Sequence, residues 1–449
     1  MFASKLRGNL KSVGYFVQHG YGVSTVASSK LNATGKLIST EASPHSIPGV
    51  RYQSIRPGSH ATTVRDASNA VRSIFCRINK TRTFQAIGLI SQCALIQRHV
   101  AELRSPYKVR TILQACALVT EENTEVTKLA VSALHQLASL RTDVWQDYKN
   151  QEHLRWVLHW AAKCRCTSPV FTKLLQQHLD VLCLDQCRVV AQCTHALFML
   201  NSPDRCLAQN LKNRYWTIHS TGDPKYRHTQ VLSLLLYCTL CGVECSALLK
   251  LISVDQLIQK CNGTQLQLLL LHNILPVTAD QRQQIMDKCS LWFQEDVKSQ
   301  QSGRMYDMLS YFIGPKYTTG TSLVDGVKVN ALCIFNQDHE PVETDAYPAN
   351  VYNGVSVDMT AATHGHHGFS VVACLGVKDT QLLRHPGHVP NGYDVLRVSA
   401  LKWQGCYCIP MILEHGAAKT QKSSQFVPDL MINYPDHIPV FKHLLAPKQ

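Results

Sequence analysis

Helical segments recur along the middle of this chain at a nearly constant interval, and this recurrence limits the folds open to it. Apolar helices are predicted to begin near Pro169, Arg205, Cys245 and Asp280. Partner helices are predicted between them, beginning near Cys187, Arg227, Gly263 and Ser302. Each pair therefore spans about 35 to 40 residues, and it buries its apolar face against the next pair. This pattern is typical of an α-solenoid, and a non-repeating helical bundle is the alternative.

Turn-forming residues separate the predicted helices, for example Asn201–Asp204 and Thr221–Pro224, which each combine a proline with polar residues. Helical periodicity extends back to about Val64 with weaker phasing, and strand signals are scarce before Ile313. We therefore assign residues 66–165 to an N-terminal helical region and residues 166–315 to a helical-repeat region. The chain is predicted to be mainly α.

The segment 369–413 has a different pattern. Val371–Val377 forms an apolar, β-prone run, and a loop rich in proline and histidine follows it. Leu396–Trp403 has the spacing of a short amphipathic helix, which Gly405 ends because glycine reaches positive φ at no steric cost. Cys406–Leu413 is apolar again. The order strand, loop, helix, strand predicts a small α/β domain with a mixed sheet at the C-terminal end of the helices.

The N-terminus is predicted to be a targeting segment. Residues 1–40 contain five Lys or Arg and no Asp or Glu, and their apolar residues can share one helical face. These features are typical of a mitochondrial transit peptide, with a disordered basic tail as the alternative. Residues 41–65, which contain three prolines, are assigned to a linker. No apolar run reaches the roughly 18 residues that a membrane-spanning helix needs, so we expect no membrane span.

Charge and cysteine content restrict the function only weakly. The net charge is +14, but residues 1–65 supply eight basic residues and one acidic residue, which leaves +7 for the rest. A mildly basic body is compatible with RNA and with other partners. The 18 cysteines lie mostly in leucine-rich helices rather than in a compact framework. This distribution favours buried free thiols and a reducing compartment over a disulfide scaffold.

The C-terminal segment also carries a recognisable residue order. Leu383 and Gly387 lie in the loop, Arg397 and Leu401 lie on the helix, and Gly405–Ile409 leads into the second strand. This order resembles the RAP domain of the FAST-kinase-domain family of mitochondrial RNA-binding proteins. A stretch from Gly314 to Pro341 is similar to the junction that precedes RAP in that family. Cys406 departs from the pattern, since an aromatic residue is common there.

The resemblance implies an architecture and a function. It implies a helical-repeat array followed by a small C-terminal α/β domain with a restriction-endonuclease-like outline. The corresponding parts are a connecting segment at 316–368, the RAP-like domain at 369–430 and a tail at 431–449. It also implies a mitochondrial matrix protein that binds mitochondrial RNA and acts in transcript processing, RNA stability or ribosomal RNA maturation. Proteins of RNA granules or of ribosome assembly are the implied protein partners.

Single-stranded RNA is held by cations that contact phosphates and by aromatic faces that stack on bases. The candidates around the C-terminal helix are Lys378, Arg384, Arg397, Lys402, Trp403 and Tyr407. A second basic and aromatic group consists of Lys212, Arg214, Tyr215 and Trp216, whose aromatic residues can likewise be exposed or belong to the core. The prediction requires Trp403 to be exposed, whereas the alternative places it in the core with the cations on an ordinary polar surface.

Enzymatic alternatives are less well supported by the residues. The chain has no glycine-rich loop, His-Arg-Asp or Asp-Phe-Gly motif, which excludes a protein kinase of the usual type. A Mg²⁺-dependent endonuclease would need acidic residues at a strand end, and Asp358 or Asp379 with Lys402 are the available candidates. A protein-interaction scaffold is the third possibility. We expect a non-catalytic RNA-binding protein without a cofactor.

Two groups of potential metal ligands are interpreted as structural. Cys238, Cys241 and Cys245 have thiolate spacing that zinc can use, but no second pair follows and leucines surround them. His364, His366 and His367 lie in a glycine-containing segment that is typical of a solvated loop. The sequence therefore predicts no resident metal.

Overall fold

The computed structural model describes residues 96–98, 100, 103–119, 123–178, 186–219, 224–297, 303–336, 338–346, 356–357, 370–378, 382–385 and 389–413. All of them belong to the larger of two compact units, Ala61–Gln449. The predicted transit peptide, the whole predicted linker at 41–65 and the predicted C-terminal tail lie outside the described residues.

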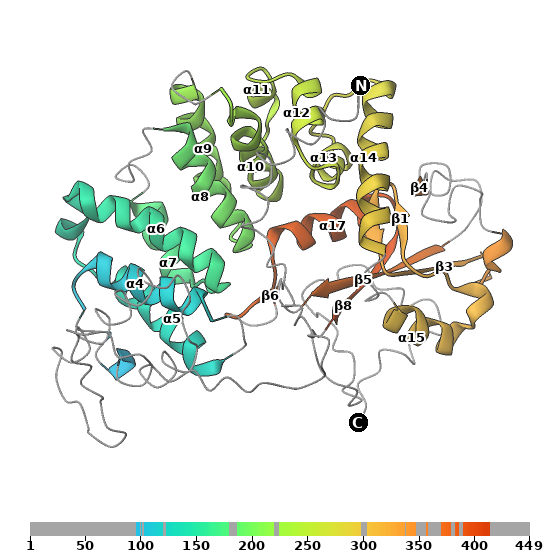
Figure 1. Ribbon diagram of the computed structural model, residues 1–449, viewed down its shortest axis with the longest axis horizontal. Helices are drawn as coiled ribbons and strands as arrows, with labels where there is room; N and C mark the ends of the chain where they lie inside the picture. Colours follow the sequence, from blue (N-terminus) through green and yellow to red (C-terminus); the bar gives the residue numbers. More distant parts are fainter. Residues whose placement is uncertain are drawn as a thin grey trace, which may run out of the picture. The chain divides into compact units, whose positions relative to one another are not determined.

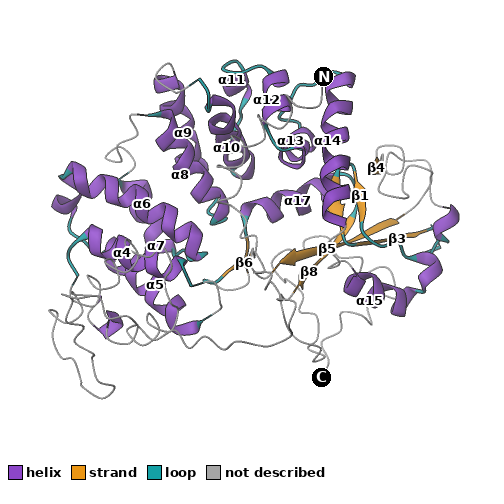
Figure 2. Ribbon diagram, viewed as in Figure 1, coloured by secondary structure: helices purple, strands orange, loops and turns teal. Residues whose placement is uncertain are grey.

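Helices dominate the described residues, as the sequence predicts (Figures 1 and 2). The first group comprises α4 (Pro106–Ala117), α5 (Thr124–Ala138), α6 (Tyr148–Cys164), α7 (Pro169–Gln177), α8 (Cys187–Met199), α9 (Arg205–Ile218) and α10 (Arg227–Leu240). The second comprises α11 (Ser246–Leu249), α12 (Val254–Lys260), α13 (Gly263–Leu271), α14 (Ala279–Val297), α15 (Gly303–Ile313) and α17 (Gly392–Trp403). The predicted starts of α7, α8, α9, α10 and α13 are confirmed to the residue.

Local capping explains why these starts are readable from the sequence. The Ser168 hydroxyl accepts a hydrogen bond from the Phe171 amide, and Pro169 occupies the first turn of α7, where its missing N–H costs nothing. The Asp204 carboxylate accepts from the Leu207 amide at 2.7 Å at the start of α9. Each cap satisfies a backbone donor that the helix itself leaves unpaired.

The helices pack with their next-but-one neighbours as well as with adjacent ones. α4 packs on α6, α6 on α8, α8 on α10, and α10 on α12. A second set of contacts joins α5 to α7 and α12 to α14. Apolar faces of successive helices are thereby buried against one another over most of the described chain.

Among the described residues, three small sheets are formed after α15, and α17 lies between their last two strands in the chain. Their strands are β1 (Ser322–Val324), β2 (Val327–Val329), β3 (Ala331–Phe335), β4 (Ser356–Val357), β5 (Ser370–Lys378), β6 (Leu382–Leu383), β7 (Val389–Pro390) and β8 (Tyr407–Leu413). β1 and β2 form an antiparallel hairpin across Asp325 and Gly326, whose φ angles of 45° and 76° suit a type I′ turn. β4 runs parallel to β1, and β6 pairs with β7.

The largest described pairing has the order β3-β5-β8, with β3 antiparallel and β8 parallel to β5. Residues 392–403 form α17 between the two parallel strands, so the predicted strand–helix–strand order and mixed sheet are confirmed. β3 lies within residues 316–368, which the sequence interpretation treats as a connecting segment. All five residues of β3 are buried, and they complete the apolar neighbourhood of β5. The predicted boundary at residue 369 therefore divides a single sheet.

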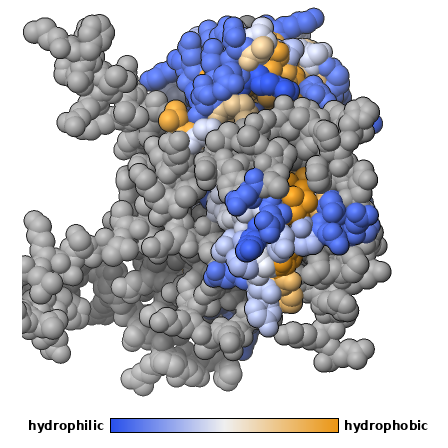
Figure 3. Space-filling view, turned by 90° about the vertical axis from the view of Figure 1, so that its right-hand side faces the viewer, coloured by the Kyte–Doolittle hydropathy of each residue, from blue (hydrophilic) through white to orange (hydrophobic). Residues whose placement is uncertain are grey.

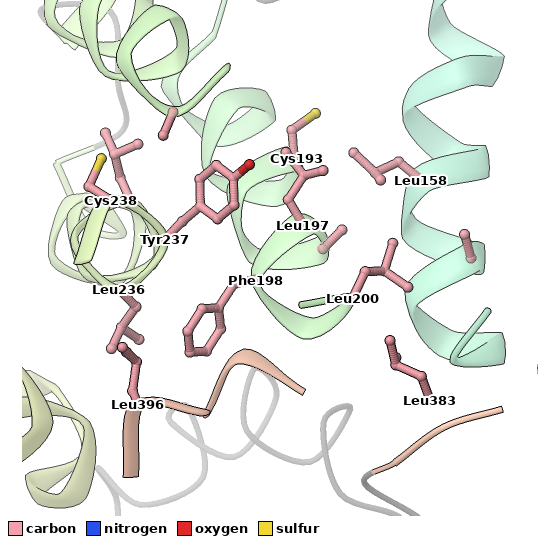
Figure 4. Close-up of a cluster of buried hydrophobic side chains, with 14 of the residues drawn as sticks. Leu158, Cys193, Leu197, Phe198, Leu200, Leu236, Tyr237, Cys238, Leu383 and Leu396 are labelled. Carbon is pink, nitrogen blue, oxygen red and sulfur yellow. The ribbon is translucent and has the colours of Figure 1, made fainter. Parts of the chain in front are cut away.

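The helical part and the C-terminal part share one core. Figure 4 shows Leu158 of α6, Phe198 of α8 and Leu236 of α10 in a cluster with Leu383 of β6 and Leu396 of α17. The fit is tight where α17 begins, because a Cβ on Gly392 would clash with the Phe198 carbonyl oxygen. A larger residue at this position would push α17 away from α8.

The cysteines of the described residues are free thiols, and all are buried except Cys206 and Cys241. Their burial agrees with the role expected from the sequence. Within the described part of the chain, no helix is both long and apolar enough to cross a membrane. The face shown in Figure 3 is mixed, with hydrophilic residues and smaller hydrophobic areas among the described ones.

Candidate nucleic-acid interface

α17 is fixed at both ends by its own sequence. The Asn391 side chain accepts a hydrogen bond from the Asp394 amide at 3.0 Å, which caps the N-terminus. At the other end Gly405 has a φ of 80°, its amide donates to the Lys402 carbonyl, and the Cys406 amide donates to the Leu401 carbonyl. These two bonds form a Schellman motif. The last turn, which carries Lys402 and Trp403, is therefore held in a defined conformation.

Trp403 is exposed, with 61% of its surface accessible. This exposure excludes the alternative in which Trp403 belongs to the core. Its ring lies 4.8 Å from that of His272, which follows α13. His272 is buried and its Nε2–H donates to the Leu396 carbonyl at 3.2 Å, while burial lowers its pKa. A neutral, fixed imidazole thus supports one side of an indole that is open to a planar ligand.

Lys402 and Tyr407 flank Trp403. Lys402 precedes it on α17 and is half-buried, and Tyr407 begins β8 and is also half-buried. A lysine beside an exposed indole is the combination that single-stranded nucleic acid requires, since one group contacts phosphate and the other stacks on a base. Lys402, Trp403 and Tyr407 lie within one short stretch of the chain, and all three are at least partly accessible.

Arg397 has a structural role instead of the predicted one. It is buried, with 9% of its surface exposed, and its Nη1 donates to the Asp394 carboxylate at 2.9 Å. Its Nη2 donates to the Lys328 carbonyl at 2.7 Å, which connects α17 to β2. A guanidinium enclosed in this way cannot bind phosphate without breaking a buried ion pair. The sequence assignment of Arg397 to RNA is therefore replaced by a role in positioning α17.

Of the two remaining candidates, Arg384 has a described side chain and Lys378 does not. Arg384 is half-buried, and its Nη2 donates to the Val119 carbonyl at 3.0 Å, so it ties β6 to the segment after α4. Lys378 ends β5, and its side chain lies outside the described structure. The five predicted residues whose side chains are described therefore do not act as one surface, because Arg397 is enclosed and Arg384 is bound to the segment after α4.

The second predicted group, on α9, is only partly accessible. Tyr215 is buried and its hydroxyl donates to Gln230 Oε1 at 3.4 Å. The Lys212 ammonium donates to the Glu244 carbonyl at 2.9 Å. Trp216 is 41% exposed beside the ring of His219, and Arg214 is exposed. Arg214 and Trp216 are therefore the exposed members of this group, and they are accessible to a ligand.

Of the enzymatic and metal candidates, the structure describes the three cysteines and Lys402. Asp358, Asp379 and the histidines at 364, 366 and 367 lie outside the described residues. Cys238 and Cys245 are buried and Cys241 is half-buried, and burial raises the pKa of Cys241 to about 11. The Cys241 thiol therefore stays protonated at neutral pH unless a metal ion displaces its proton. Among the described residues, no three His, Cys, Asp or Glu side chains are grouped to hold a metal ion.

The sequence interpretation missed a further cluster on α4 and α6. Arg110, Arg155 and Trp156 lie together there, with two histidines close by. The signal was present, because Glu152, Trp156, His159 and Lys163 recur at spacings of four, three and four, which places them on one helical face.

Comparisons with family models, with curated proteins and with solved structures gave no match to this chain.

Proposed function

We propose that this protein binds single-stranded RNA in the mitochondrial matrix and acts after transcription, in RNA processing, RNA stability or ribosomal RNA maturation. The observation that carries the proposal is the exposed Trp403, which is adjacent to Lys402 on a capped last turn of α17. The site needs no catalytic group, because holding a transcript requires only stacking and charge neutralisation. The matrix location rests on the acid-free residues 1–40.

The proposed architecture supports this function. β5, α17 and β8 follow the order expected of a RAP-like domain, and we propose that identity for them. The next-but-one packing from α4 to α14 is compatible with a degenerate helical repeat, which would offer an extended surface to an RNA chain. RNA would then contact the helical array and the C-terminal domain together.

One observation favours a protein-interaction scaffold as the second candidate. Tyr311 and Phe312 on α15 are 85% and 44% exposed, and adjacent exposed aromatic residues are frequent at protein interfaces. This scaffold function does not require RNA.

The test is RNA binding as a function of salt, measured with a fluorescent single-stranded oligonucleotide. Lys402→Gln should weaken binding and reduce the log–log salt slope by about 0.7, the value for one phosphate contact in a single strand. Trp403→Ala should cost about 1–3 kcal/mol of binding free energy with little change in slope, because a stacked base contributes no charge. Thermal melts should show a small loss of stability, since Trp403 is largely exposed.

Tyr311→Ala and Arg282→Gln serve as matched controls, because both residues are exposed and lie on other helices, α15 and α14. RNA affinities that fall equally in the control and test variants would contradict the site at α17. A wild-type protein that fails to retain single-stranded RNA at low salt would favour the scaffold function.

A further inference from the structure

α4 and α6 carry a cluster of cations and aromatic rings that the site at α17 does not use. The guanidinium carbon of Arg110 lies 5.3 Å from the ring centroid of Trp156, and that of Arg155 lies 5.2 Å from it. The two arginines belong to different helices, and both guanidinium groups contact the Trp156 ring. Cation–π contact of this kind fixes a guanidinium while leaving its N–H groups able to bind an anion.

The cluster lies on the outward face of α6. Trp156 and His159 share a helical face with Glu152 and Lys163, whereas Leu154 and Leu158 of the opposite face are buried. Trp156 and His159 are half-buried, and Lys163 is exposed. The aromatic edge of α6 is therefore accessible beside its cations.

Histidine rings extend the aromatic surface. His159 lies 5.8 Å from the Trp156 ring and 5.0 Å from the Trp160 ring. Burial, with a smaller contribution from Lys163, lowers the pKa of His159 to about 4. His159 is thus a neutral planar ring at physiological pH, which suits stacking rather than ion pairing.

The charge around the cluster is mainly positive. Arg110, Arg155 and Lys163 contribute three cations, and Arg110 Nη1 also lies 3.3 Å from His153 Nδ1. Two carboxylates oppose these cations: Glu152, which lies 3.5 Å from Arg155, is half exposed and also acts on Arg110, and Asp147, which acts on His153. Among the described atoms, Nε of Arg155 and Nε1 of Trp160 are buried donors without a hydrogen-bond partner. Both of these donors are buried, so the charges of Arg110, Arg155 and Lys163 are what would attract an anionic ligand to this surface.

We propose that α4 and α6 form a second binding surface for single-stranded RNA, in which Arg110 and Arg155 contact phosphates and His159 stacks on a base. Trp156 positions the two guanidinium groups. RNA is favoured over an acidic peptide because the half-exposed neutral ring matches a base, whereas a peptide carboxylate would use only the cations. The inference rests on the proposed RNA-binding function but names a site separate from Trp403.

The experiment uses the full chain and two probes of equal length, oligouridine and an abasic ribose-phosphate chain. Arg110→Gln with Arg155→Gln should weaken both complexes and reduce the salt slope by about 1.4, since each phosphate contact contributes about 0.7. His159→Ala should weaken oligouridine binding by about fivefold or more and leave abasic binding unchanged, because only a base can stack. Arg282→Gln on α14 is the charge-matched control and should change neither.

Circular dichroism melts confirm that each variant is folded. A folded double-arginine variant with wild-type affinity and slope would overturn this second site, while the α17 variants still report on the proposed function. A double variant that binds both RNA probes normally but loses polyglutamate would assign the surface to acidic proteins and also overturn the inference. Wild-type protein that binds neither RNA probe would overturn both proposals.

Discussion

Burial separates two residues of α17 that the sequence treats alike. Arg397 and Trp403 were both expected to contact RNA, yet 9% of the first and 61% of the second is exposed. The difference follows from helical phase: Arg397 lies three residues after Asp394 and four before Leu401, both of which are buried. Trp403, six residues further on, faces away from that side. Residue type identified the candidates, and only packing decided between them.

His272 gives a prediction about pH at the same scale. Its pKa is lowered by burial, so the folded state disfavours the protonated ring. The unfolded state then binds more protons, and the free energy of unfolding should fall as pH drops from about 6.5 towards the lowered pKa. Urea unfolding at pH 7.5 and 5.5 should show that His272→Gln loses less stability than the wild type. An equal loss of stability in His272→Gln and in the wild type would contradict the lowered pKa of His272.

Comparing His272→Gln with the wild type isolates the contribution of His272. Other half-buried histidines with a lowered pKa, such as His153 and His228, are present in both the variant and the wild type. Their contributions to the pH dependence cancel in the difference. His135→Gln, at an exposed position on α5, controls for the loss of one imidazole from the chain.

At the scale of elements, the sequence located helices better than strands. Helix starts depend on local caps, such as Ser168 before α7 and Asn262 before α13, and these are visible in a few residues. The strands β1 and β2 have three residues each, too few for a periodic signal. Asp325-Gly326 between Val324 and Val327 was the available hairpin signal. The pairing of β3 with β5 depends on residues about 40 positions apart, which local patterns do not specify.

The C-terminal end of α17 can be tested with one substitution. Gly405 has a φ of 80°, where a Cβ costs about 1–2 kcal/mol. Gly405→Ala should therefore lower the free energy of unfolding by roughly that amount in urea titrations, and it should weaken RNA binding through displacement of Lys402 and Trp403.

Gly320→Ala is the matched control. An added Cβ at Gly320 meets nothing within 4 Å, and its φ is not in the positive range, so its effect should be within about 1 kcal/mol and in the stabilising direction. Equal unfolding free energies for the two alanine variants would mean that the Schellman turn after Trp403 does not constrain α17.

For the molecule as a whole, the C-terminal segment is bound into the helices instead of following them as a separate domain. The Arg384 amide donates to the Arg165 carbonyl at 2.7 Å, and the Thr167 amide donates to the His385 carbonyl at 3.2 Å. Arg165 Nη1 also donates to the Leu382 carbonyl at 3.1 Å. Residues more than 200 positions apart are thus joined by backbone pairing, a long-range feature that the sequence pattern did not reveal.

Because the helices and the C-terminal segment share a core and backbone hydrogen bonds, we expect the helices and the β5–β8 sheet to unfold together. Leu383 is 3% exposed and lies in the cluster with Phe198 and Leu396, so Leu383→Ala should cost about 2–5 kcal/mol. Because the core is shared, hydrogen exchange measured by mass spectrometry should show lost protection in peptides from α8 as well as from β5. Val170→Ala, at a site that is 50% exposed on α7, should leave both peptides protected. Loss confined to β5 would mean that the C-terminal part opens on its own, and Trp403 would then be presented by a domain that moves independently of α8.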